Sequence, residues 1–172
     1  MVNNKTKKKL KKMKQMNHQT YPYPFPPPLE NKPKCLIIIG EYSESNEVLS
    51  AITLFSVLGC ELKVISPDYK QNDKVILSSH YYSDFNLAKQ SLRASHIYTS
   101  IDSKLCGITH DFDNCNYKEC DILFLPGGKA PHYLQNDKRV LNIISNFIER
   151  ENTFIVANCN GVKLLLGLLK NR

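Results

Sequence analysis

The stretch "CLIIIGEYSESNEVLSAITLFSVLGCELKVIS", residues 35–66, contains two strand-like runs on either side of a helical pattern. "CLIIIG" (35–40) is continuously apolar and ends at glycine, which is typical of a strand covered on both faces. "ELKVIS" (61–66) predicts a second strand. Asn46 is the expected N-cap of the helix between them, and Gly59 its expected end. The stretch therefore predicts a right-handed strand, helix, strand unit with parallel strands. The apolar residues of its helix recur at helical spacing: Val48, Ile52, Phe55 and Leu58.

The same alternation continues toward the C-terminus. "DILFLPGG" (121–128) predicts a strand, and Asp137 is the expected N-cap of the helix "KRVLNIISNFIERE" (138–151). "TFIVAN" (153–158) predicts a buried strand that runs into a leucine-rich helix. Residues 67–105 predict only an excursion from the main sheet. The order of the elements predicts one α/β domain in which helices sandwich a parallel sheet.

The charge is concentrated at the N-terminus. Residues 1–34 hold nine lysines against one acid, a net charge of +8, which leaves −1 for residues 35–172. The lysine block repels itself and the proline-rich stretch after it is extended, so we expect a disordered tail followed by a single domain. The tail suits a nuclear address, a weak contact with anionic partners, a polyproline ligand or no specific role. No apolar run reaches the length of about 20 residues that crosses a bilayer, so we expect no membrane contact.

The chain contains six cysteines and no apolar signal-peptide core at its start. These features favour a reducing compartment with free thiols, so we expect a cytoplasmic protein, with a nuclear alternative through the tail. Cys115 and Cys120 are spaced C-x4-C without a second pair at zinc-ligand spacing, and we expect no metal site. The cysteines are residues 35, 60, 106, 115, 120 and 159.

Three loops with unusual residues follow predicted strands. The carboxyl ends of parallel strands meet at one edge of the sheet, where ligands bind, so these loops are expected to lie together. They are "GEYSESNE" (40–47), "PGGKAPH" (126–132) and "NCNG" (158–161).

Cys159 lies in the last of these loops, just before a predicted helix. The partial positive charge of a helix N-terminus stabilises a thiolate, and the small Gly161 permits the tight turn of a nucleophile elbow. Backbone N–H groups at the helix start and at Gly127 or Gly128 can then hold an oxyanion. The pattern equally suits an inert buried thiol.

Three motifs together resemble the ThiJ/PfpI superfamily, often called DJ-1/PfpI. They are "IIIGEYSESNEV", "FLPGGKAPHYL" and "ANCNGV", in the family's order and separation. The resemblance covers about residues 35–172 and is greatest to the plant-type glyoxalase III branch. It implies a flavodoxin-like fold, similar to class I glutamine amidotransferases, that is incomplete at the C-terminus because family members continue past the elbow helix.

The resemblance also implies roles for single residues. Cys159 falls on the nucleophile and Glu44 on the acidic residue that hydrogen-bonds its thiolate. The N–H groups of Gly127 or Gly128 and of Asn160 would form the oxyanion hole. The implied reaction converts methylglyoxal to lactate without any cofactor, in a homo-oligomer such as a dimer. Protein deglycation, peptidase activity, chaperone activity and oxidation sensing are related implied activities.

Two positions depart from the family pattern. Many catalytic members have His after the cysteine, where this chain has Asn160, which cannot shuttle a proton near neutral pH. The Glu that pairs with that His across a subunit boundary is replaced by His132. Either His132 of a neighbouring chain supplies the base, or it is a surface histidine and the relay is missing. The second case predicts an oxidative-stress sensor or a chaperone-like interaction protein in place of an enzyme.

Overall fold

The computed structural model describes residues 31–79 and 104–170. The predicted tail, up to residue 30, and the greater part of the predicted excursion lie outside the described residues.

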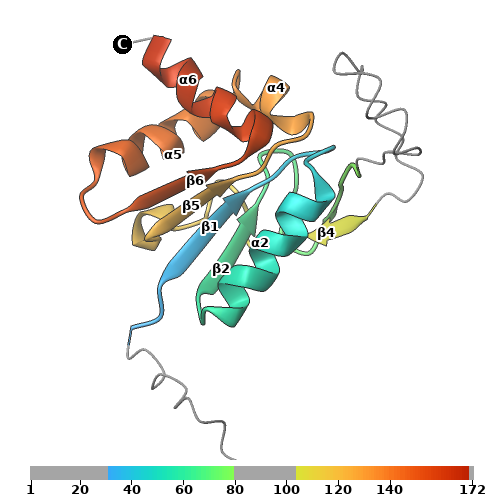
Figure 1. Ribbon diagram of the computed structural model, residues 1–172, viewed down its shortest axis with the longest axis horizontal. Helices are drawn as coiled ribbons and strands as arrows, with labels where there is room; N and C mark the ends of the chain where they lie inside the picture. Colours follow the sequence, from blue (N-terminus) through green and yellow to red (C-terminus); the bar gives the residue numbers. More distant parts are fainter. Residues whose placement is uncertain (1–30, 80–103, 171–172) are drawn as a thin grey trace, which may run out of the picture. The chain divides into compact units, whose positions relative to one another are not determined.

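Four parallel strands form the main sheet, in the order β2-β1-β5-β6 (Figure 1). Because β1 lies between β2 and β5, the chain first adds β2 on one side of β1 and later adds β5 on its other side. The carboxyl ends of β1 and β5 therefore mark the topological switch point of the sheet, where α/β folds bind ligands. The predicted flavodoxin-like sheet is confirmed. Its strands are β1 (Lys34–Ile38), β2 (Glu61–Ile65), β5 (Ile122–Leu125) and β6 (Phe154–Ala157).

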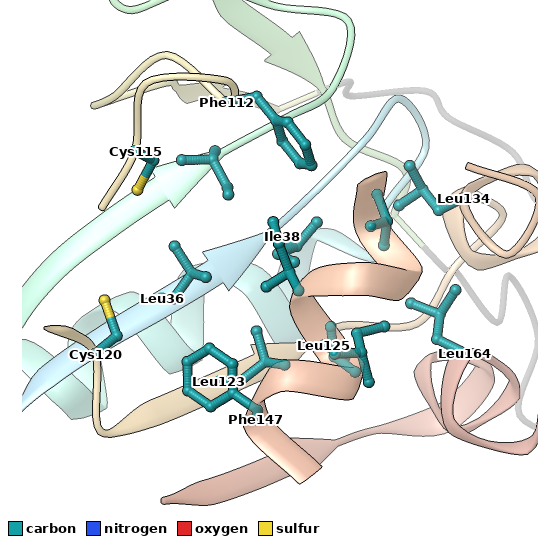
Figure 2. Close-up of a cluster of buried hydrophobic side chains, with 14 of the residues drawn as sticks. Leu36, Ile38, Phe112, Cys115, Cys120, Leu123, Leu125, Leu134, Phe147 and Leu164 are labelled. Atoms are coloured by element: carbon teal, nitrogen blue, oxygen red, sulfur yellow. The ribbon is translucent and has the colours of Figure 1, made fainter. Parts of the chain in front are cut away.

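Helices cover both faces of this sheet (Figure 1). On one face, α2 (Ser45–Val57) packs Val48 and Phe55 against alternate residues of β1 and β2. On the other face, α5 (Lys138–Glu149) and α6 (Val162–Lys170) contribute to a second apolar cluster, which Figure 2 shows around Phe147 and Leu164. The smaller elements are β3 (Lys74–Ile76), β4 (Leu105–Gly107), α4 (Ala130–Leu134) and the 3-10 turns η1 (Tyr117–Glu119) and η2 (Cys159–Gly161).

The predicted helix caps are confirmed at two of three positions. Asp137 caps α5 by accepting a 2.8 Å hydrogen bond from the Arg139 N–H. Gly59 follows α2 with φ of 80°, the left-handed conformation that suits glycine after a helix. The prediction that Asn46 caps α2 is wrong. Glu44 is the N-cap, because its backbone is extended and its carboxylate accepts a 2.7 Å hydrogen bond from the Glu47 N–H.

The strand β6 is less buried than its apolar sequence predicts. Ile155 and Ala157 pack against the cluster beneath α5, but Phe154 is 68% exposed and Val156 is 42% exposed. Successive side chains of a strand point to opposite faces, and β6 is the last strand of the described sheet. The described residues therefore cover only one face of β6.

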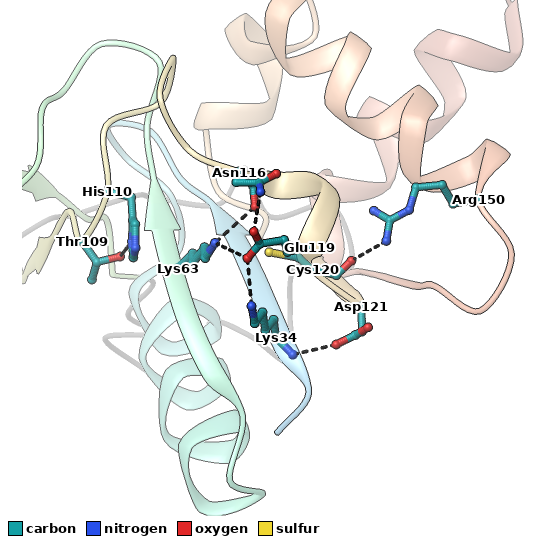
Figure 3. A network of polar contacts seen from close by, with 9 residues as sticks. All are labelled: Lys34, Lys63, Thr109, His110, Asn116, Glu119, Cys120, Asp121 and Arg150. Carbon is teal, nitrogen blue, oxygen red and sulfur yellow. Dashed lines mark hydrogen bonds and ion pairs between the residues drawn. The ribbon is translucent and has the colours of Figure 1, made fainter. Parts of the chain in front are cut away.

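A network of polar side chains ties the start of β1 to the loop before β5 (Figure 3). The backbone N–H of Lys34 donates a 2.8 Å hydrogen bond to Asp121, and its ammonium group lies 2.8 Å from the Glu119 carboxylate. The buried ammonium group of Lys63 donates to the carbonyl of Asn116. This network lies at the amino end of β1, away from the loops that carry the candidate site.

Within the described part of the chain, no helix combines the length and the apolar character that a membrane crossing requires.

Candidate active site

Cys159 lies at the turn between β6 and α6, where its sequence position predicts it. The Asn158 side chain accepts a 3.0 Å hydrogen bond from the Cys159 N–H, and the Gly161 N–H donates to the Asn158 carbonyl at 2.7 Å. Cys159 has φ of 48°, an uncommon value for a residue other than glycine, and its side chain is exposed. The turn thus holds the thiol outward in a strained backbone, as a nucleophile elbow does.

Glycines let the backbone segments around this turn approach closely. A Cβ atom on Gly127 would lie 2.6 Å from the Cβ of Cys159, and one on Gly128 would lie 2.5 Å from the Glu44 nitrogen. Gly128 also has φ of 84°. A Cβ on Gly161 would overlap the carbonyl of Leu125. The double glycine after β5 and the glycine after Cys159 are therefore required by the packing of the site.

Glu47 is the acidic residue beside the cysteine turn. Its carboxylate accepts a 2.6 Å hydrogen bond from the Gly127 N–H. The position that a Cβ on Gly127 would occupy is 3.0 Å from this carboxylate and 2.6 Å from the Cys159 Cβ. Glu47 and Cys159 therefore flank the same small residue.

The carboxylate of Glu44, the predicted partner of the thiolate, caps α2 instead and is buried. Glu44 and Glu47 are three residues apart at the start of the same helix, and the sequence prediction chose between them by spacing alone. The signal that distinguishes them is the capping pattern. A carboxylate that caps a helix accepts a hydrogen bond from the N–H three residues later in the chain. Glu44 has this role, and the carboxylate of Glu47 is the one that contacts the loop after β5.

The predicted oxyanion donors are brought together in part. The Gly127 N–H is bound to Glu47, so a hole at this turn would rest on the N–H groups of Gly128 and Asn160. The backbone nitrogen of Asn160 lies 3.0 Å from the Cβ position of Gly127, and its side-chain amide donates a 2.9 Å hydrogen bond to the Gly128 carbonyl. Asn160 thus connects the cysteine turn to the double glycine.

His132 lies on α4 beside the N-terminal part of α6. Its Nε2 atom is 3.3 Å from the ammonium group of Lys163, and its side chain is exposed. The structure thus gives His132 a neighbour within its own chain that the sequence did not predict. Lys163 is four residues beyond Cys159, in the first turn of α6.

The loop after β1 is anchored on two sides. The Tyr42 N–H donates to the carbonyl of Ile76 at 2.8 Å, and the Tyr42 carbonyl accepts a 2.8 Å hydrogen bond from the Lys129 N–H. The Ser45 N–H donates to the Ser78 carbonyl at 2.7 Å. The bond from Lys129 holds this loop against the loop after β5, and the other two bonds hold it against the segment that contains β3.

The other cysteines are less exposed than Cys159. Burial raises the pKa of Cys35 to about 12 and that of Cys120 to about 11. Burial likewise raises the pKa values of the thiols of Cys60, Cys106 and Cys115. Cys159 is the exposed thiol among the six, all of which lie in the described residues. In residues 31–79 and 104–170, no cluster of three or more His, Cys, Asp or Glu side chains could hold a metal ion.

The fold and this site define a class of protein, a flavodoxin-like α/β domain with an exposed cysteine on a strained turn at the carboxyl edge of its sheet. The chain belongs to the DJ-1/PfpI family, which matches residues 33–172.

Among curated relatives, the chain is 29% identical over 141 residues to Protein DJ-1 homolog D of Arabidopsis thaliana. The match covers 81% of this chain and 34% of the relative. DJ-1 protein homolog E of the same plant is 21% identical over 132 residues, which cover 77% of this chain and 30% of the relative. The chain thus spans about a third of the length of these curated relatives.

Solved structures of the family have the same fold. A two-domain protein from Anabaena variabilis, with DJ-1/ThiJ/PfpI-like and ferritin-like domains, superposes with a TM-score of 0.58 at 18% identity. That match covers 80% of this chain and 32% of the other. Schizosaccharomyces pombe DJ-1 superposes with a TM-score of 0.57 at 12% identity, over 81% of this chain and 64% of the other.

Proposed function

We propose that this protein is a cofactor-independent thiol enzyme that acts on small reactive aldehydes, of the glyoxalase III or deglycase type. The observation that carries the proposal is that Cys159 and the carboxylate of Glu47 flank the same residue, Gly127. An exposed thiol on a strained turn, next to a carboxylate that can accept its proton, is the arrangement that nucleophilic catalysis needs.

The chemistry follows from this arrangement. The thiol of Cys159 gives its proton to the Glu47 carboxylate, and its sulfur adds to the aldehyde carbon of methylglyoxal. The N–H groups of Gly128 and Asn160 stabilise the resulting oxyanion. Glu47 returns its proton to this oxyanion, and the carboxylate so regenerated moves the proton of the same carbon to the adjacent carbonyl carbon. The hydroxyl proton passes to the former ketone oxygen, which yields the thioester of lactate. Water cleaves the thioester, so that methylglyoxal and one water become lactate and the thiol is regenerated.

The test is turnover of methylglyoxal to lactate by the full chain and by three variants. Cys159→Ser should abolish turnover, and Glu47→Gln should lower kcat by about 100-fold or more, the usual contribution of a general base. Glu44→Gln is the matched control, because it keeps a cap acceptor on the same helix and should leave kcat within about twofold. Equal losses in Glu44→Gln and Glu47→Gln would show that Glu47 has no special role. Turnover that survives Cys159→Ser would refute the thiol mechanism.

Asn160 favours a second candidate, an oxidation sensor without turnover. Its amide is bonded to the Gly128 carbonyl, and an amide moves no proton near neutral pH. An exposed thiol beside hydrogen-bond donors suits oxidation to a sulfenic acid, a step that needs no proton relay.

Two measurements separate these candidates. The sensor hypothesis predicts that dilute peroxide oxidises Cys159 before the other five cysteines while methylglyoxal is not consumed. Asn160→His places a titratable group at the same position, and a gain of turnover in this variant would identify the missing proton relay as the cause. Turnover in the unmodified chain would exclude the purely sensory function.

A further inference from the structure

An open hollow of about 880 Å³ lies among the loops at the carboxyl edge of the sheet. It is lined from three strand ends, by the loops that follow β1, β2 and β5. It therefore occupies the switch point of the sheet, where α/β folds bind ligands, and its volume lies within the range of small-molecule sites. Neither Cys159 nor Glu47 lines it.

One wall of the hollow is acidic. Glu41 and Asp68 both line it, and the Glu41 carboxylate accepts a hydrogen bond from the Tyr69 hydroxyl. That bond, followed by burial and by the charges of Glu41 and Asp68, raises the pKa of Tyr69 to about 12. Burial, followed by the charges of Asp68 and Glu41, also raises the pKa of Tyr133. Both phenols therefore lie in the negative field of this wall.

A second wall carries basic groups. Lys129 and His132 line the hollow from the segment after β5, and the Nζ atom of Lys163 lies 3.3 Å from the Nε2 atom of His132. The ammonium group of Lys129 lies 6.0 Å from the centre of the Tyr42 ring, a cation–π contact. Acidic groups thus come from the loops after β1 and β2, and basic groups from the loop after β5.

Aromatic rings also line the hollow. Tyr42, Tyr69 and Tyr133 all line the hollow, and the Tyr133 hydroxyl is fixed by a 3.1 Å hydrogen bond to the Glu41 carbonyl. Such rings offer apolar surface to a hydrocarbon group and a favourable face to an ammonium group.

We propose that this hollow binds small zwitterions of the amino-acid type. The ammonium group of the ligand pairs with Glu41 and Asp68, its carboxylate pairs with Lys129 and His132, and its side chain lies against the tyrosine rings. The presence of both acidic and basic side chains in the lining selects ligands that carry both charges, because a ligand with one charge pairs with only one of the two walls. The inference concerns binding and requires no reaction at the thiol.

The experiment is a calorimetric titration of the full chain carrying Cys159→Ser, which excludes thiol chemistry. The probes are L-phenylalanine, phenethylamine and 3-phenylpropionate, which share the ring and differ in the charged groups. L-Phenylalanine should bind more tightly than either of the others, by up to about fivefold, the upper end of what one solvent-exposed ion pair contributes. This titration measures binding whether or not the protein turns over methylglyoxal. Either proposal can therefore be refuted without refuting the other.

Two charge variants then test which wall binds which charged group of the ligand. Asp68→Asn should weaken L-phenylalanine and phenethylamine by about fivefold and leave 3-phenylpropionate unchanged, and Lys129→Gln should show the opposite preference. Glu61→Gln, at the amino end of β2, is the control and should change none of the three. Both lining residues are exposed, so circular dichroism should show folded variants. Absence of saturable binding, equal affinity for the three probes, or indifference to both charge variants would each overturn the proposal.

Discussion

The carboxylate of Glu47 accepts a 2.6 Å hydrogen bond from the backbone N–H of Gly127, and Gly127 is in turn packed against Cys159. This contact joins the start of α2 to the loop after β5. Because β5 and β6 are neighbours, the same contact brings a carboxylate from early in the chain to a cysteine 112 positions later. The position of the carboxylate therefore depends on the absence of a side chain at Gly127.

Gly127→Ala tests this dependence. The added methyl group would lie 2.6 Å from the Cβ of Cys159, closer than atoms pack, so the turn must move. We expect the unfolding free energy to fall by about 1–3 kcal/mol, as in other overpacked sites. We also expect the alkylation rate of Cys159 by iodoacetamide to change.

Gly167→Ala is the matched control for this substitution. A Cβ atom on Gly167 meets no atom within 4 Å, and alanine favours a helix over glycine by about 0.5–1 kcal/mol. This variant should be equally or more stable, with Cys159 unchanged. If both variants behave alike, packing at Gly127 does not shape the cysteine turn.

The order in which the six cysteines react is a second prediction. Cys159 is exposed, whereas burial raises the pKa of Cys35 to about 12 and of Cys120 to about 11, so these buried thiols remain protonated at pH 8. Iodoacetamide at pH 8 should therefore label Cys159 first, as read by peptide mass spectrometry. In Cys159→Ser, the native protein should take up label only slowly, and urea should then release the remaining thiols. Rapid labelling of Cys120 in the native protein would contradict the buried position of that thiol.

Much of the fold follows from the sequence because its signals are local. The apolar run of β1, the periodicity of α5 and the caps at Asp137 and Gly59 each depend on a few adjacent residues, and the structure confirms them. The exposure of β6 could not be predicted in this way. A run of four apolar residues indicates a strand, but the cover of each face depends on elements far away in the sequence.

The candidate site was predictable to the level of its loops. The strand order brings Cys159, the double glycine and the loop after β1 to one edge, as expected of parallel strands. Glu44 and Glu47 are three residues apart, and spacing alone did not show which of them caps α2 and which binds the Gly127 N–H. Glu47 was missed for this reason. The contact between His132 and Lys163 was not predicted because these residues lie on different helices, α4 and α6, and no sequence pattern indicates that the two helices are neighbours.

Asp137 gives a prediction on pH. The hydrogen bond from the Arg139 side chain is the main cause that lowers the pKa of Asp137 below its usual value of 3.8. A carboxylate with a lowered pKa stabilises the fold above its unfolded-state pKa, and this stability is lost as the pH falls through the folded-state pKa. Asp137→Ala should lower the unfolding free energy by about 1 kcal/mol at pH 7, the usual effect of removing an N-cap.

Urea unfolding at several pH values measures this effect. The difference between the unmodified protein and Asp137→Ala should shrink as the pH falls below 3.8, because the carboxyl group then becomes neutral in both folded and unfolded states. Asp137→Asn keeps an acceptor for the helix and should lose less stability at pH 7. A difference that stays constant from pH 7 to strongly acidic solution would mean that the charge of Asp137 contributes nothing.

Phe147 and Phe154 form a matched pair that tests the uneven cover of the sheet. Phe147, on α5, is 2% exposed within the cluster that Figure 2 shows, whereas Phe154, on β6, is 68% exposed. Phe147→Ala should lower the unfolding free energy by about 3–5 kcal/mol, because it removes a buried ring and leaves a cavity. Phe154→Ala should change it by no more than about 0.5 kcal/mol, since its ring already faces solvent. Urea unfolding at low protein concentration measures both values.

A loss of several kcal/mol in Phe154→Ala would show that another chain, or a segment outside the described residues, covers this face of β6 in solution. A dependence of that loss on protein concentration would then identify a second copy of the chain as the cover.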